Sequence, residues 1–178
     1  MRNVGKFRLE EGLLAGPTPT ANRTTVERKS ERELVVTRTI NGPARLVFEA
    51  WTKPDLFKQW WVPKSIGISL LSCEMDVRVG GKYRLVFGFG ASESMEVFGK
   101  YIEVTPHSRL VWTNDEGDNG GAVTTVTFDE KGDKTLLVKD ELYPSKESLD
   151  AAMASGENCG ISETLEQLDD LGASLGQS

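Results

Sequence analysis

A long stretch of short strand-like runs, from residue 66 to residue 143, constrains the fold most. Turn-forming residues interrupt this stretch at five places. Apolar, β-branched and aromatic runs spaced in this way are typical of an antiparallel meander, and we count six strands in it. The interruptions are Gly80-Gly81, Gly90-Ala91-Ser92, Pro106-His107-Ser108, residues 115–121 and residues 130–133.

One strand and two short helices are expected before this meander. Residues 33–40 are rich in β-branched side chains, alternate with period two, and end at Asn41-Gly42. Pro43 and Pro54 each suit the first turn of a helix, because the N–H that proline lacks would be unpaired there. Apolar residues recur at helical spacing after both prolines, and Pro63 ends the second helix.

Two helices are expected after the meander. Pro144-Ser145 can cap a helix over residues 146–154, and Gly156 breaks it. Apolar residues then recur at near-heptad spacing from Ile161 to Leu175, and this stripe must pack on the one available sheet. The order predicts an α+β helix-grip fold, in which a curved antiparallel sheet of about seven strands wraps on a long C-terminal helix.

Composition and charge narrow the class of protein. The chain has 178 residues, 38% of them hydrophobic and 27% charged, as expected for one globular domain. Its net charge of −6 repels phosphate, so nucleic acid and anionic membrane are not expected as partners. No run is long enough for a membrane helix or a signal peptide, which makes the cytoplasm the default location. Residues 1–30 lack apolar periodicity and are interpreted as a flexible tail before a domain of residues 31–175.

The residue types that usually carry metal or nucleophilic chemistry are scarce. Cys73 and Cys159 lie far apart, and His107 is the single histidine. His107 falls in an expected turn, where a solvated side chain is the common outcome. We therefore expect no metal and no cofactor, and we find no activated nucleophile and no paired acid and base.

Several motifs resemble those of the START-like (SRPBCC) superfamily, in the branch named for the activator of heat-shock-protein-90 ATPase. They occur in the family's order and spacing between about residues 31 and 175. They are Val47–Pro54, Gln59–Pro63, Cys73–Arg84, Gly99–Pro106, Arg109–Thr113 and Tyr143–Ser145.

Two departures from the family pattern matter. Family members usually open the last helix with Gly-Trp-Gly, whereas this chain has Gly160-Ile161-Ser162, so an aromatic lid over the pocket mouth is not expected. The activators that name the branch also carry a separate N-terminal domain, which ~30 tail residues are too few to form.

The resemblance implies a cavity between the curved sheet and the terminal helix. An empty cavity of ~300 Å³ would cost ~7 kcal/mol, so either a ligand fills it or the site collapses. Each large side chain there also stabilises the core by ~1.5–3 kcal/mol, with or without a ligand. The candidate ligand-binding residues are Trp60, Met75, Tyr83, Leu85, Phe87, Phe89, Tyr101, Trp112, Phe128, Val138, Asp140, Ile161 and Leu165.

Two of these candidates have competing interpretations. By the period-two rule Asp140 shares the face of Leu136 and Val138, which we expect to point toward the terminal helix. It is then either a polar hook for a ligand, or it lies past a register break, in solvent or paired with an arginine such as Arg84. Trp60-Trp61 forms either an exposed patch for a partner protein or part of the core beneath the sheet edge.

Three functions remain open at this point. The first is a binding module for a small hydrophobic or aromatic molecule held between sheet and terminal helix. The second is a protein-interaction role similar to the chaperone activator, which uses strand edges and the Trp60-Trp61 region. The third is an enzyme resembling the cyclases and dehydratases of the superfamily, in which Tyr83, Tyr101 or Asp140 moves a proton. The residues favour binding over catalysis.

Overall fold

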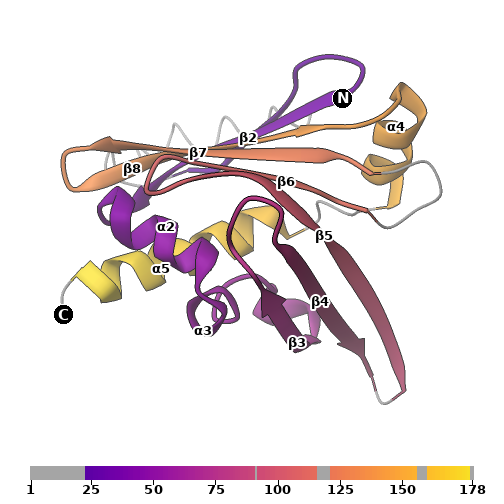
Figure 1. Cartoon of the computed structure of the whole chain (residues 1–178), viewed down its shortest axis with the longest axis horizontal. Coiled ribbons are helices and arrows are strands. Elements are labelled where there is room, and N and C mark those ends of the chain that lie inside the picture. The colour runs from indigo at the N-terminus through magenta and orange to yellow at the C-terminus, as the bar shows by residue number, and fades with distance from the viewer. Residues whose placement is uncertain (1–22, 91, 116–120, 156–159, 177–178) are drawn as a thin grey trace, which may run out of the picture.

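The computed structural model describes residues 23–90, 92–115, 121–155 and 160–176, and these build one eight-stranded antiparallel sheet (Figure 1). The strand order across the sheet is β1-β2-β8-β7-β6-β5-β4-β3. The strands are β1 (Thr25–Arg28), β2 (Glu33–Asn41), β3 (Ile68–Met75), β4 (Lys82–Phe89), β5 (Glu93–Thr105), β6 (Arg109–Thr113), β7 (Val123–Lys131) and β8 (Lys134–Leu142).

The helices occur where the prolines and the apolar spacing predict them. Helix α2 (Ala44–Thr52) starts directly after Pro43, and α3 (Pro54–Phe57) starts on Pro54 itself. A 3₁₀ turn (Lys64–Ile66) leads into β3, while α4 (Lys146–Ser155) and α5 (Ile161–Gly176) follow β8. The predicted order of a strand, two short helices, six strands and a terminal helix is confirmed, and with it the helix-grip fold.

Strand β1 lies within the segment interpreted as a flexible tail. Thr25–Arg28 pairs with β2 along its whole length, so at residues 25–28 that interpretation differs from the structure. All four β1 side chains are exposed, and for this reason the segment shows no apolar pattern in the sequence. Residues 1–22, the rest of the predicted tail, lie outside the described residues.

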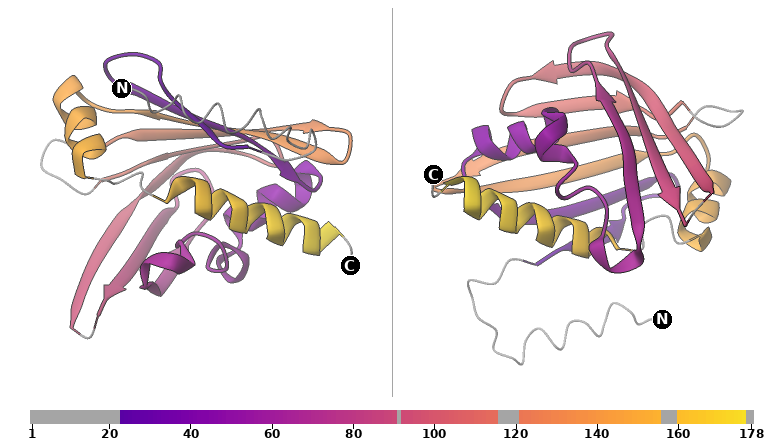
Figure 2. Two further views of the ribbon diagram at one scale, coloured as in Figure 1. Left: turned by 180° about the vertical axis from the view of Figure 1, so that it is seen from behind. Right: turned by 90° about the horizontal axis from the view of Figure 1, so that it is seen from below.

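The sheet is strongly curved, and its two halves have different neighbours. Helix α5 runs across the concave side beside β2 and α2, while β3, β4 and β5 project away as an arm (Figures 1 and 2). Pairing shifts by one residue between Leu70 and Ser72 of β3 and between Tyr101 and Glu103 of β5. Such bulges increase twist, in agreement with the bend between the arm and the rest of the sheet.

Helix α5 is fixed to β2 by apolar and ionic contacts. Leu165 and Leu168 are fully buried in the main core. The buried Arg38 guanidinium donates to Asp169 Oδ2 over 2.8 Å, and the Asn41 backbone N–H donates to Asp169 Oδ1 over 2.8 Å. One carboxylate on the helix therefore receives donors from two positions on the strand.

The expected orientation of β8 is wrong by one residue. Leu137 lies in the core with the α5 leucines, whereas Leu136, Val138 and Asp140 lie on the other face of the sheet. Leu137 pairs across the sheet with Arg38 and Phe128, both buried, and this register sets the face of β8. Since Leu136, Leu137 and Val138 are consecutive, the apolar pattern of β8 alone fits either face.

Candidate functional site

The turn from α2 to β3 gathers aromatic side chains against the sheet. Trp51 comes from α2, Phe57 ends α3, and Trp60 and Trp61 follow it. Trp60 is 1% exposed and its indole N–H donates to the Ala50 carbonyl over 2.9 Å. The ring centroids of Trp51 and Trp60 are 4.8 Å apart, and those of Phe57 and Trp61 are 4.5 Å apart in a stacked arrangement. Of the two interpretations of Trp60-Trp61, core packing is therefore confirmed for Trp60.

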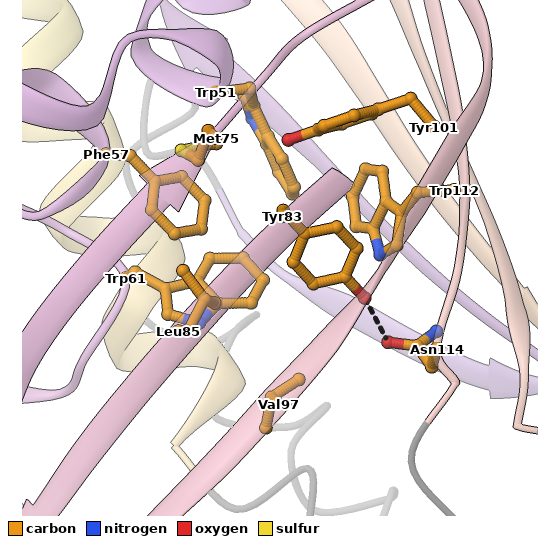
Figure 3. A pocket seen from close by; sticks show the side chains of 10 residues that line it. All are labelled: Trp51, Phe57, Trp61, Met75, Tyr83, Leu85, Val97, Tyr101, Trp112 and Asn114. Atoms are coloured by element: carbon orange, nitrogen blue, oxygen red, sulfur yellow. Dashed lines mark hydrogen bonds between the residues drawn. The ribbon is translucent and has the colours of Figure 1, made fainter. Parts of the chain in front are cut away.

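A small apolar pocket lies where this aromatic cluster meets the arm of the sheet (Figure 3). Its volume is about 40 Å³. Its walls come from α2, α3 and the turn after it on one side, and from β3 to β6 on the other. The lining residues are Trp51, Phe57, Trp61, Met75, Tyr83, Leu85, Val97, Tyr101, Trp112 and Asn114.

The position and size of this pocket differ from the expectation. No residue of α5 lines it, so the pocket lies between the sheet and the two short helices. Its volume of about 40 Å³ has room for roughly three water molecules. A ligand pocket usually measures at least ~300 Å³. Apolar side chains of the chain itself, seven of them aromatic, form the buried core beside the pocket, so the interior does not carry the cost of a void of that size.

The polar end of the pocket is the Asn114 carboxamide. Its Nδ2 group donates to the Ala122 carbonyl over 2.9 Å and to Thr124 Oγ1 over 3.2 Å. Its Oδ1 atom accepts from the Tyr83 hydroxyl over 3.1 Å, the contact drawn in Figure 3. Because the Ala122 carbonyl can only accept, the two ends of the amide are assigned without ambiguity.

The other polar groups of the pocket are strongly desolvated. Burial, with smaller effects from Cys73 and Asp76, raises the pKa of Tyr101 well above its usual value. The Cys73 thiol is not part of the lining; burial raises its pKa to about 11, so this thiol is protonated at neutral pH. Trp51 Nε1 is buried and has no hydrogen-bond partner within the described residues. The pocket therefore contains weakly polar, uncharged groups.

Five predicted ligand-binding residues line this pocket: Met75, Tyr83, Leu85, Tyr101 and Trp112. Trp60, Phe128 and Leu165 are core residues, and Phe87 and Ile161 pack at the margin of the core. Phe89 lies at the outer end of the arm, where it pairs with Ile68 and Glu93. Val138 and Asp140 lie on the opposite face of the sheet.

The prediction missed half of the lining: Trp51, Phe57, Trp61, Val97 and Asn114. The helical spacing of the residues after Pro43 places Trp51 on the apolar face of its helix. No local signal shows that this face packs beside β4 and β6. Val97 pairs with Leu85, already a candidate, so the β4–β5 register identifies it once the strands are aligned. Asn114 follows the last residue of β6 and reads as an ordinary turn residue.

Asp140 has a different partner from the arginine considered for it. Arg84 forms ion pairs with Glu74 and Glu96 on the arm. Burial, followed by a hydrogen bond with Glu33 and repulsion from that carboxylate, raises the pKa of Asp140 to about 6. Asp140 therefore has an acidic neighbour, Glu33, and lies away from the pocket.

The fold and this apolar site define a START-like helix-grip protein. A family model for activator of Hsp90 ATPase homolog 1-like proteins matches residues 41–173, and the chain belongs to this family. No curated protein matches the chain. Among the described residues, no helix is long and apolar enough to cross a membrane.

Solved structures from several bacteria share the fold. A protein from Nitrosomonas europaea is 24% identical with a TM-score of 0.75, and the match covers 84% of this chain and 99% of that one. A protein from Rhodobacter sphaeroides is 22% identical with a TM-score of 0.77, covering 85% and 99%. An AHSA1-like protein from Aeromonas hydrophila is 18% identical with a TM-score of 0.63, covering 78% and 94%. These likenesses concern the fold.

Proposed function

We propose that the protein binds a small apolar or aromatic molecule in the pocket between the sheet and helices α2 and α3. The observation that carries the proposal is the lining, in which six aromatic and three aliphatic residues surround a single carboxamide. Apolar walls with a few oriented polar groups are the usual composition of a small-molecule site. The absence of charged residues among the lining residues argues against an ionic ligand, because burying an unpaired charge is very unfavourable.

The rim of the pocket supports this proposal. Trp61, Met75 and Val97 are only partly buried and pack against the core from its margin. Methionine is flexible and adapts to gaps of irregular shape. Outward movement of these side chains would enlarge the pocket of about 40 Å³ and would break one weak contact, from the Cys73 thiol to Met75 Sδ at 3.5 Å. The expected ligand is therefore a single ring or a short chain.

A substitution that fills the pocket tests the proposal. We expect toluene to give a saturable change in tryptophan fluorescence, because Trp51, Trp61 and Trp112 line the pocket. Val97→Phe adds volume at the rim and should weaken toluene binding at least ~10-fold, about 1.4 kcal/mol. Val79→Phe is the matched control, since Val79 is 64% exposed and does not line the pocket. Equal toluene binding by Val97→Phe and the wild type would contradict the proposal.

A second candidate, a protein-interaction role, is favoured by a groove on the outer face of the arm. The groove has a volume of about 630 Å³. Its lining carries charges of both signs around Phe98, which is 39% exposed. Ile102, four residues further along β5, is 44% exposed. Exposed apolar side chains within a polar rim are typical of partner surfaces.

The test of this second candidate is an ATPase assay with the host's own Hsp90-type chaperone. Stimulation that the wild type gives and Phe98→Ser does not would support it, with Val26→Ser, at the opposite edge of the sheet, as control. No stimulation at micromolar concentrations would end it.

A further inference from the structure

Among the residues that the structure describes, one group, the Tyr83 hydroxyl, lies in position to donate to the carboxamide oxygen of Asn114. The Tyr83 hydroxyl carries one proton but lies within hydrogen-bond distance of two acceptors, the Thr113 carbonyl at 2.7 Å and Asn114 Oδ1 at 3.1 Å. The proton favours the nearer acceptor. An amide oxygen can accept two hydrogen bonds, so Asn114 Oδ1 has capacity for a further donor.

The surrounding backbone holds this carboxamide in place. Both Nδ2 protons are used, by the Ala122 carbonyl at 2.9 Å and by Thr124 Oγ1 at 3.2 Å. Thr124 is 1% exposed, so its hydroxyl gives a fixed partner that solvent does not replace. The oxygen of Asn114 consequently cannot rotate away from the pocket without breaking two hydrogen bonds.

Gly99 is required for this arrangement. A Cβ atom at position 99 would lie 1.9 Å from the Thr113 carbonyl oxygen and 2.9 Å from the Tyr83 hydroxyl. Only glycine lets β5 approach the end of β6 so closely. The backbone thus brings the Tyr83 hydroxyl, the Thr113 carbonyl and Asn114 together beside aromatic walls.

We propose that the pocket selects uncharged, single-ring aromatic molecules that carry a hydroxyl or N–H donor, and that Asn114 Oδ1 is the specificity-determining acceptor. This inference rests on the proposed binding function. A purely apolar pocket disfavours a hydroxyl, because its burial without a partner is unfavourable. An oriented acceptor such as Asn114 Oδ1 reverses that preference. Comparing the affinities of ligands of equal size, with and without a donor, therefore tests the role of Asn114.

Phenol and toluene are the probes, because they match in size and differ in the donor. The free-energy cost of widening the rim is then nearly the same for both ligands, and it cancels in the ratio of their dissociation constants. In titrations followed by tryptophan fluorescence and by ligand-observed NMR, we expect the wild type to bind phenol about fivefold more tightly than toluene. Asn114→Leu should reverse the order, so that this variant binds toluene more tightly than phenol; the comparison is made between the two ligands within the variant, because the substitution also removes the hydrogen bonds of Asn114 Nδ2. Anisole, which has the oxygen without the donor, should behave as toluene does.

A second variant separates the contribution of Asn114 from that of the Tyr101 hydroxyl, which also lines the pocket. Tyr101→Phe removes the Tyr101 hydroxyl and leaves the ring, and a phenol preference that disappears in this variant would assign selectivity to Tyr101 instead. Equal wild-type affinities for phenol, toluene and anisole would overturn the inference and leave the proposed function standing. If none of the three binds the wild type, the proposed function fails, and the inference with it.

Discussion

At the scale of single residues, the position and the partners of a polar side chain were the features that the sequence did not predict. From the sequence, one hypothesis for Asp140 was a polar contact to a ligand, but Asp140 lies on the opposite face of the sheet, next to Glu33. Asn114 was not among the predicted ligand-binding residues, although it forms the polar end of the pocket. The sequence shows which side chains are polar, but their partners depend on the register of strands that are far apart in the chain.

Asp140 should make stability depend on pH. Its pKa is raised to about 6 from 3.8, so between those values the folded chain binds more protons than the unfolded chain. Folding stability from this group is therefore present at low pH and is lost as pH rises through about 6. After a discount for solvent screening, we expect Asp140→Asn to raise the free energy of unfolding at pH 7 by ~1 kcal/mol and to leave it little changed at pH 4.

Urea denaturation at a series of pH values measures this effect as a difference between variant and wild type. Asp129→Asn is the control, because Asp129 is an exposed carboxylate on the neighbouring strand β7. If the free energy of unfolding of the variant runs parallel to that of the wild type from pH 4 to pH 7, the pKa of Asp140 is not raised by folding.

At the scale of elements, the pairing of α5 with β2 determines how the terminal helix grips the sheet. The near-heptad stripe predicted that α5 packs on the sheet, and Leu165 and Leu168 confirm it. The polar half of this contact was not predicted. Arg38 alternates with apolar residues in β2 and belongs to the buried face, where Asp169 on α5 neutralises its charge. Arg38 and Asp169 are 131 residues apart, so neither residue predicts the other locally.

Breaking this ion pair should destabilise the protein strongly. Asp169→Asn leaves the Arg38 guanidinium buried without a counter-charge, and we expect the free energy of unfolding to fall by ~3 kcal/mol. The double variant Arg38→Met with Asp169→Leu should recover much of the loss, because packed apolar side chains replace a buried pair at little cost. Chemical denaturation of the wild type, Arg38→Met, Asp169→Leu and their double variant forms the double-mutant cycle, and additive losses would show that the two residues are not coupled.

Gly172 tests how closely the helix approaches the strand. A Cβ atom there would lie 2.1 Å from the Asn41 carbonyl oxygen, so Gly172→Ala must move α5 away from β2. Alanine favours a helix by ~1 kcal/mol over glycine, yet we expect a net loss of ~1–3 kcal/mol because the clash is with backbone. Ser174→Ala is the control, an exposed position two residues further along the same helix. A rise in stability in Gly172→Ala, measured by thermal unfolding, would contradict the contact.

At the scale of the whole molecule, two regions of the sheet pack against different helices. The region around β2, β8 and β7 is covered by α2 and α5 and holds the core, whereas the arm of β3, β4 and β5 meets α3 beside the pocket (Figures 1 and 2). The sequence predicted the element order and the family, because turn residues and motifs are local signals. It did not predict the volume left inside, because that volume depends on how the aromatic rings of distant elements pack together.

The edge strand β1 belongs to the fold even though its side chains are exposed, and its removal should show this. Without residues 1–30, β2 becomes an unprotected edge with alternating apolar residues, and Arg38 loses its hydrogen bond to Thr24 Oγ1 at 2.9 Å. We expect a loss of ~1–2 kcal/mol in the free energy of unfolding, from the lost strand pairing and this one hydrogen bond. Self-association in sedimentation velocity should increase as well. A chain lacking only residues 1–22 keeps β1 and should match the full-length protein in both measurements. If the two truncated chains are equally stable and equally monomeric, β1 contributes nothing, and the domain begins at β2.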